Sequence, residues 1–322
     1  NVPDVENLNN HLEKEGVKIK SNLEKSIELA KEIKKDIKKI NKDLLEKKKL
    51  GWEEKKRLEE LIEKQNALQN QIEQLKEKNA AKQKKQEKYK TISPELLEKQ
   101  QQLEKLFDEV LDKQTKKLLD EMQKMMDEMN KEKLKEMLDK MEQNESDLEK
   151  ELDRNLELFK QLEFEKKLEE TIDKLNNIKE KQETLKEKTE DDSSDSKELE
   201  KQQEELNKEF EDLKKSLEEL EKKNNALEEK NKMPDTEKQE NKISEKMQES
   251  KSDLQKNKKK KASKSQKETL DKMSELEKKL QDLQSSSCSN QQEEDMETLR
   301  QILENLIRLS FDQEDLMQKV NV

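Results

Sequence analysis

The sequence predicts an all-α protein, an elongated assembly of coiled-coil segments and helical hairpins. Of its 322 residues, 47% are charged and only 27% are hydrophobic, and the chain has two glycines and three prolines. A single compact domain of this length would contain roughly 45–50% apolar residues and many more turn formers. Disorder is disfavoured too, because the 70 basic and 81 acidic residues interleave and the apolar residues recur at spacings of three and four.

The first two predicted segments are an N-terminal helix over residues 1–50 and a coiled-coil helix with a basic linker over residues 51–92. In the first, apolar side chains form one stripe: Leu23, Ile27, Ala30, Ile33, Ile37, Ile40 and Leu44. Gly51 interrupts this pattern and Trp52 begins the second helix. Its seam alternates spacings of three and four and includes two polar residues: Leu58, Leu61, Gln65, Leu68, Ile72, Leu75 and Asn79. From Ala80 to Thr91, lysine and glutamine replace the apolar residues, which favours a linker or a frayed helix.

The longest predicted element is a central helix over residues 93–188, either one very long helix or two nearly continuous ones. It has no glycine and no proline beyond Pro94. Ser93 is the predicted N-cap, and Pro94 occupies the first helical position. One continuous helix of this length would reach roughly 140 Å at 1.5 Å per residue. Its apolar face is wider than a two-stranded seam, so we expect it to contact two or more helices.

Several apolar side chains are candidate partner contacts on this element and on the C-terminal helix. They are Met122, Met125, Met126, Met129, Phe159, Phe164 and Phe311. Methionine adapts to irregular contacts, although methionines at helical spacing also serve in ordinary packing. Phe159 and Phe164 are five residues apart and point in different directions, so one of them is expected to contact a separate partner.

Three segments are predicted after the central helix. Residues 189–233 form a coiled-coil helix in which Asn224 occupies a core position, where a buried asparagine fixes register and strand number. Residues 234–284 form a weakly periodic, lysine-rich helix. Residues 285–322 comprise a polar linker, which contains the single cysteine Cys288, and a C-terminal helix whose apolar content should dock onto another surface.

A block of lysines interrupts the second of these segments. It comprises Lys256, Lys258, Lys259, Lys260, Lys261 and Lys264. Residues 251–267 contain eight lysines and one acid, Asp253, on a chain whose net charge is −11. Such a block is either solvated and neutralised by its own chain or a contact for an anionic surface or polymer. Nucleic acid is disfavoured, because the block has no aromatic residue for stacking and no arginine for bidentate phosphate contacts.

Catalytic, cofactor and metal sites are not predicted. A phosphate-binding loop needs clustered glycines, whereas Gly16 and Gly51 stand far apart. His11 and Cys288 have no partner at metal-ligand spacing. The longest apolar run has two residues, so no segment is expected to span a bilayer. Because the chain begins at Asn1, we expect it to be a piece of a longer protein.

Four stretches resemble a family of large coiled-coil proteins of Bacteroidota that is described as a domain of unknown function and sometimes loosely as ATPases. They are KLGWEEKK from Lys49, LLEKQQQLEKL from Leu96, ELDRNLELFKQLEFEKKL from Glu151 and LRQILENLIRLSFDQEDLM from Leu299. The resemblance implies a parent anchored by transmembrane helices near its N-terminus, with this region outside the cytoplasm. It implies no activity and no site residues, and the glycine content gives the ATPase description no support.

We therefore expect a non-enzymatic scaffold or tethering segment of a larger cell-envelope protein, which needs no cofactor and contacts other proteins or a second copy of itself. The alternative is a binding module for an anionic surface or polymer, using the Lys256 to Lys264 block. A chaperone that holds unfolded clients on its methionine-rich faces is a third possibility.

Overall fold

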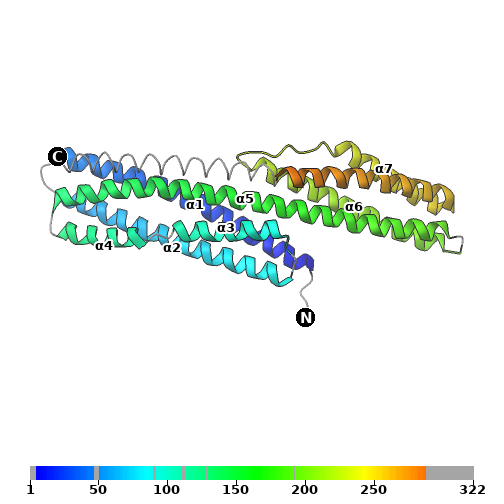
Figure 1. The fold of residues 1–322 in the computed structure, drawn as a ribbon, viewed down its shortest axis with the longest axis horizontal. Coiled ribbons are helices and arrows are strands. Elements are labelled where there is room, and N and C mark those ends of the chain that lie inside the picture. The colour runs from blue at the N-terminus through cyan, green and yellow to red at the C-terminus, as the bar shows by residue number, and fades with distance from the viewer. Residues whose placement is uncertain are drawn as a thin grey trace, which may run out of the picture. The chain divides into compact units, whose positions relative to one another are not determined.

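Helices form every regular element in the computed structural model, which describes residues 5–46, 51–89, 92–110, 113–127, 130–191 and 193–287. They are α1 (Val5–Glu46), α2 (Trp52–Tyr89), α3 (Pro94–Val110), α4 (Lys113–Asp127), α5 (Lys131–Glu190), α6 (Ser196–Asn225) and α7 (Glu237–Gln255), followed by a helix at 259–287. Within these ranges there is no strand, so the predicted all-α fold of helical hairpins is confirmed. Figure 1 shows the order of the helices.

The chain divides into two compact units, Asn1–Glu163 and Phe164–Val322, which we call unit 1 and unit 2. The boundary falls inside α5, so residues 131–163 of this helix belong to unit 1 and residues 164–190 belong to unit 2. Each unit has its own set of buried apolar side chains.

Unit 1 is a bundle of four antiparallel helical segments, in which α3 and α4 together make the third segment. An ion pair between Arg57 and Asp43 joins α1 and α2 near their turn, and Lys85 Nζ lies 2.8 Å from Glu15 Oε1 near the other end of the hairpin. After α2 the chain reverses direction, and α3 and α4 run back along α2 and contact it. The first half of α5 runs antiparallel to α1.

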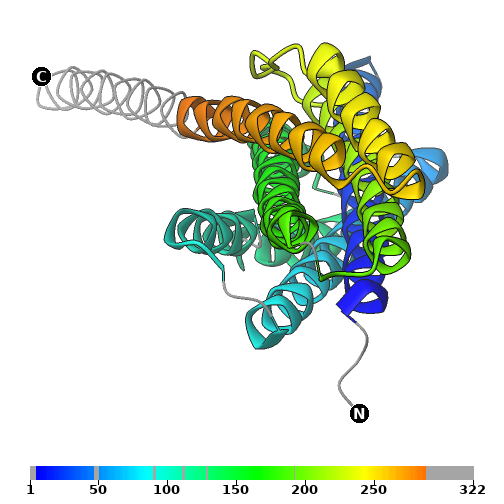
Figure 2. The ribbon, with the colours of Figure 1, turned by 90° about the vertical axis from the view of Figure 1, so that its right-hand side faces the viewer.

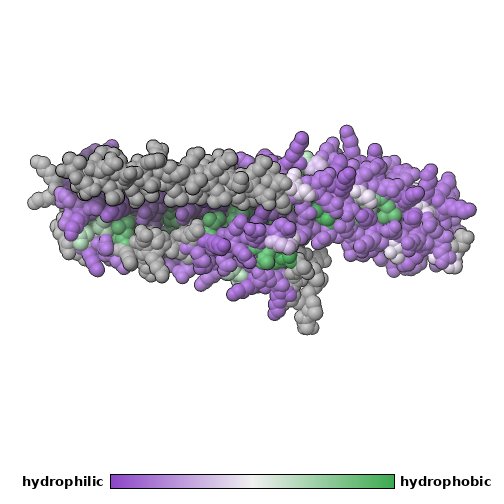
Figure 3. Space-filling view, viewed as in Figure 1, coloured by the Kyte–Doolittle hydropathy of each residue, from purple (hydrophilic) through white to green (hydrophobic). Residues whose placement is uncertain are grey.

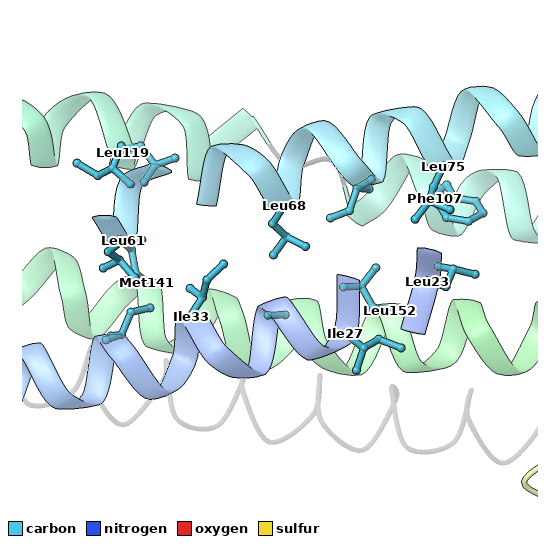
Figure 4. Close-up of a cluster of buried hydrophobic side chains, with 14 of the residues drawn as sticks. Leu23, Ile27, Ile33, Leu61, Leu68, Leu75, Phe107, Leu119, Met141 and Leu152 are labelled. Atoms are coloured by element: carbon cyan, nitrogen blue, oxygen red, sulfur yellow. The ribbon is translucent and has the colours of Figure 1, made fainter. Parts of the chain in front are cut away.

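The core of unit 1 uses the predicted stripes. The apolar residues predicted for 23–44 and 58–75 are all buried. Figure 4 shows the interior between the helices, where Leu68 of α2, Ile33 of α1 and Phe107 of α3 point inward. At roughly 1.5–3 kcal/mol for each large apolar side chain, this burial supplies the main driving force for bundle formation.

Unit 2 is a second antiparallel four-helix bundle, made from the second half of α5, α6, α7 and the helix 259–287. Figure 2 views these helices from the end, with α6 in yellow-green, α7 in yellow and the helix 259–287 in orange. Ion pairs connect successive helices: Lys181 Nζ of α5 lies 2.8 Å from Glu209 Oε1 of α6, and Lys251 Nζ of α7 lies 3.2 Å from Glu204 Oε2. The bundle closes where Lys179 of α5 pairs with Glu277.

The prediction of one continuous central helix, or two nearly continuous ones, is wrong. The segment 93–188 is divided among α3, α4 and α5, and the chain reverses direction between α4 and α5. Asn130 stands immediately before α5 as its N-cap, and its Oδ1 accepts a hydrogen bond of 3.1 Å from the backbone N–H of Lys133. The absence of glycine and proline is therefore compatible with a reversal, because asparagine caps a helix well.

Two further boundaries differ from the sequence predictions. The segment after Asn79, predicted as a basic linker or a frayed helix, is helical, since α2 continues to Tyr89. Lys82, Gln83 and Gln86 are buried there. The lysine-rich segment is not one weak helix but two helices that reverse at Asn257.

Asn224 is buried, as predicted, but it does not set the register of a helix pair. Its Nδ2 donates to the carbonyl oxygen of Asn231 and its Oδ1 accepts from the backbone N–H of Asn231, each at 2.9 Å. Asn224 therefore holds the connection that leaves the C-terminal end of α6.

The described part of the surface is mostly hydrophilic in the view of Figure 3, with small hydrophobic areas. The large apolar side chains most exposed are Val17, Leu45, Trp52 and Leu97. Trp52 is 75% exposed and lies under the ammonium group of Lys56, whose Nζ is 5.8 Å from the ring centroid.

Candidate functional site

The lysine block lies at the turn between α7 and the helix 259–287 in unit 2. Asn257 has a φ of 55°, the left-handed region that asparagine tolerates better than most residues. The carbonyl oxygen of Lys258 accepts hydrogen bonds from the N–H groups of Lys261 and Ala262, at 3.0 and 3.1 Å, which starts the next helix. The sequence showed this block only as a run of charged residues. It did not show that the chain reverses direction at Asn257.

The turn presents several ammonium groups to solvent beside a shallow, open pocket of about 430 Å³ lined by Asn257 and Lys258 to Lys261. The exposed candidates are Lys256, Lys258, Lys260, Lys261 and Lys264. Lys256 also donates to Ser252 Oγ at 3.0 Å. The structure places four consecutive lysines, Lys258 to Lys261, at one turn, although Lys259 among them has a different role.

Lys259 binds the acidic loop between α5 and α6. Its Nζ donates to the carbonyl oxygens of Asp191 and Ser194, at 3.1 and 2.7 Å. Hydrogen bonds from the backbone and side chain of Ser193, with a smaller contribution from the Lys259 charge, hold the pKa of Asp191 below its ordinary value. Ser263 Oγ also donates to Glu190 Oε1 at 2.7 Å. The turn is thus partly neutralised by its own chain.

The candidate partner contacts are mainly core residues. Met122 and Met126 are buried in unit 1, Met125 is partly buried there, and Met129 and Phe311 lie outside the described residues. Phe159 is 2% exposed in the core of unit 1, whereas Phe164 is 0% exposed in the core of unit 2. Their divergent directions are therefore explained by the boundary between the units, and their burial removes the reason to treat them as partner contacts.

A hydrogen-bonded layer of polar side chains crosses unit 2, with one residue from each of its four helices. The residues are Gln182, Gln203, Ser250 and Gln266, all 0% exposed. Gln203 Oε1 accepts from Gln182 Nε2, Ser250 Oγ and Gln266 Nε2 at 3.1, 3.0 and 3.1 Å. Sequence reasoning missed this layer, although Gln203 stands four residues after Leu199 and three before Leu206, which is a seam position. Such a layer disfavours other registers of the four helices.

Unit 1 contains a buried ion pair between Lys82 of α2 and Glu163 of α5. Lys82 is 3% exposed, and its Nζ also lies 5.0 Å from the ring centroid of Phe159. A Cβ added to Gly16 of α1 would lie 2.9 Å from both Glu163 Oε2 and Lys82 Nζ. The glycine therefore leaves space for this pair at the cost of helix propensity.

A second buried polar contact in unit 1 joins Gln65 of α2 to Glu145 of α5. Gln65 Nε2 donates to Glu145 Oε1, and both residues are 1% exposed or less. Burial raises the pKa of Glu145 to about 7, and the hydrogen bond from Gln65 opposes part of that rise. The seam pattern indicated a buried Gln65, but it gave no partner for it.

Comparisons with protein-family profiles, with characterised proteins and with solved structures give no match for this chain. Among the residues that the structure describes, no group of three or more histidine, cysteine or acidic side chains is placed to hold a metal ion. Within the same ranges, no helix is long and apolar enough to cross a bilayer.

Proposed function

We propose that this chain is a non-enzymatic scaffold segment of a larger cell-envelope protein, in which two helical bundles present surfaces to other proteins. The observation that supports the proposal is that buried polar side chains connect the helices within each bundle. In both units buried polar side chains make contacts between helices, as Lys82 does with Glu163 in unit 1 and Gln203 with its three neighbours in unit 2. These groups hold the helices of each bundle in register, which is a structural use of buried polar side chains. The envelope location rests on the family resemblance.

A complementation experiment in the source organism separates a scaffold from an enzyme. Phe164→Ala removes a core side chain, so it should weaken the function of the parent protein in step with the stability that unit 2 loses. His11→Ala removes the one histidine, a side chain 57% exposed that pairs with Glu15, and should leave function intact. If His11→Ala abolishes function while both bundles stay folded and still capture the same partner proteins, the scaffold role is contradicted.

A second candidate function is contact with an anionic surface or polymer through the turn at Lys258, Lys260 and Lys261. The exposure of these three ammonium groups at one reversal favours it. Their replacement by glutamine should remove salt-sensitive binding to vesicles that contain anionic lipid. Lys259 is left unchanged, because it holds the acidic loop. Replacing the exposed Lys201, Lys222 and Lys278 is the matched control, and equal losses in both triple variants would reject a specific site.

A further inference from the structure

A glutamate and a glutamine face each other in the interior of unit 1, where α5 contacts α2. Glu145 follows Met141 by one helical turn, and Gln65 follows Leu61 in the same way. Figure 4 shows Leu61 and Met141 inside the apolar cluster, with Leu119 of α4 nearby. A carboxylate placed here has lost nearly all of its water, because Glu145 is 1% exposed.

When Glu145 is ionised, two oxygen atoms of this pair lack a hydrogen-bond donor. Gln65 Nε2 donates to Glu145 Oε1. The two remaining oxygens, Gln65 Oε1 and Glu145 Oε2, are buried and have no hydrogen-bond partner. Both are acceptors while the carboxyl group is ionised, so neither can satisfy the other. A proton on Glu145 Oε2 supplies the missing donor and permits a second, parallel hydrogen bond.

We propose that the Gln65–Glu145 pair makes unit 1 proton-sensitive: protonation of Glu145 closes a doubly hydrogen-bonded amide–acid pair and tightens the bundle, and ionisation opens it. In the neutral pair no charge is buried and each polar atom has a partner. In the ionised pair one hydrogen bond supports a buried charge next to an unpaired amide oxygen. The proton comes from solvent and returns to it.

The charged groups on the helices around Glu145 are either paired with one another or exposed. They include the ion pairs of Glu149 with Lys31 and Lys34, of Glu142 with Lys38, and of Lys64 with Glu32 and Asp36. On α4, Asp120, Glu121 and Lys124 are exposed. Burial is therefore the main cause of the raised pKa of Glu145, at about 7, with the opposing effect of Gln65 smaller. No ion pair compensates the charge.

The direction of the pH effect follows from this rise. The pKa of Glu145 is about 7 in the folded unit and near 4.5 when exposed, so between these values the folded unit binds more protons than the unfolded chain. Its stabilising contribution is then complete below pH 4.5 and is lost as the pH rises through about 7.

Peptide-resolved hydrogen exchange on the full chain tests the proposal. After correction for intrinsic exchange, amides in residues 131–163 should open roughly 30-fold less often at pH 5.5 than at pH 8, from the linkage between the two pKa values. Amides of unit 2 in the same sample are the internal reference. Glu145→Gln pairs both hydrogen bonds at any pH, so the 30-fold difference should disappear. The matched control Glu142→Gln, on the same helix but paired at the surface with Lys38, should retain it.

Equal protection of wild-type unit 1 at both pH values would overturn the proposal, as would a full pH difference that persists in Glu145→Gln. A carbon NMR titration of the glutamate carboxyl groups in the wild-type chain gives a result that needs no variant. One resonance with a midpoint near 7 supports the proposal. If the Glu145 resonance titrates near 4.5 with the other glutamates, the pair does not respond to protons as proposed.

Discussion

Replacing Phe164 by alanine tests whether the two units have separate cores. Phe164 is 0% exposed and belongs to the apolar cluster of unit 2, whereas Phe159, five residues earlier on the same helix, belongs to that of unit 1. Loss of a buried phenylalanine removes its transfer free energy and leaves a cavity, together about 3–5 kcal/mol. This is a large fraction of the roughly 5–15 kcal/mol that stabilises a typical domain.

The assay is peptide-resolved hydrogen exchange across the whole chain, with urea unfolding as a second measurement. A loss of 3–5 kcal/mol increases the opening equilibrium by roughly 150- to 5,000-fold, at 1.36 kcal/mol for each factor of ten. In Phe164→Ala, this increase should appear in α6, α7 and residues 259–287. In the matched variant Phe159→Ala, the increased opening should appear in α1 and α2 instead.

Two outcomes would refute the reasoning. If both variants accelerate exchange over the same helices, the cores are not separate and the boundary inside α5 has no energetic meaning. If either variant costs less than about 1 kcal/mol, the phenylalanine ring does not fill the interior as the structure indicates.

Three further substitutions have defined outcomes, each measured by urea denaturation. Gly16→Ala gains about 1 kcal/mol of helix propensity, but the added methyl group pushes against the buried Lys82–Glu163 pair. The free energy of unfolding of unit 1 should therefore fall by about 1–2 kcal/mol. A net gain in stability would show that the pair moves aside freely. Gln203→Leu leaves the partners of this residue in the polar layer without an acceptor and should cost unit 2 about 1–3 kcal/mol, while an increase in stability would deny the layer a structural role. Asn257→Gly should be nearly neutral whereas Asn257→Ala costs about 1 kcal/mol, and equal effects would contradict the left-handed turn.

Helix faces were predictable from the sequence, and helix partners were not. The stripes from Leu23 to Leu44 and from Leu58 to Asn79 are buried as predicted, because a spacing of three and four defines one face of a helix. The same spacing says nothing about which helix covers that face. The predicted continuous rod failed for this reason at Asn130, where the chain turns back and supplies its own neighbour.

For the candidate sites too, the sequence predicted residue types and spacing but not which residues of other helices and turns they contact. The lysine block was visible in the sequence, but the hydrogen bonds from Lys259 to the acidic loop depend on two turns that are far apart in the chain. Glu145 gave no signal, because one glutamate among many on a charged helix is ordinarily exposed, and only the bundle shows that it is buried. The polar layer at Gln203 could have been predicted, because a glutamine occupies a seam position where an apolar residue is expected.

The boundary inside α5 bears on how the protein folds. Starting a helix is unfavourable, because several residues must be fixed before the first hydrogen bond forms, whereas extending an existing helix adds one hydrogen bond for each residue fixed. Residues 131–163 and 164–190 are one uninterrupted helix. Whichever unit forms first therefore gives the other a helix that is already started. For its share of α5, the second unit then needs only to extend this helix, so the bundle that forms first should speed the folding of the other, even though the two cores are separate.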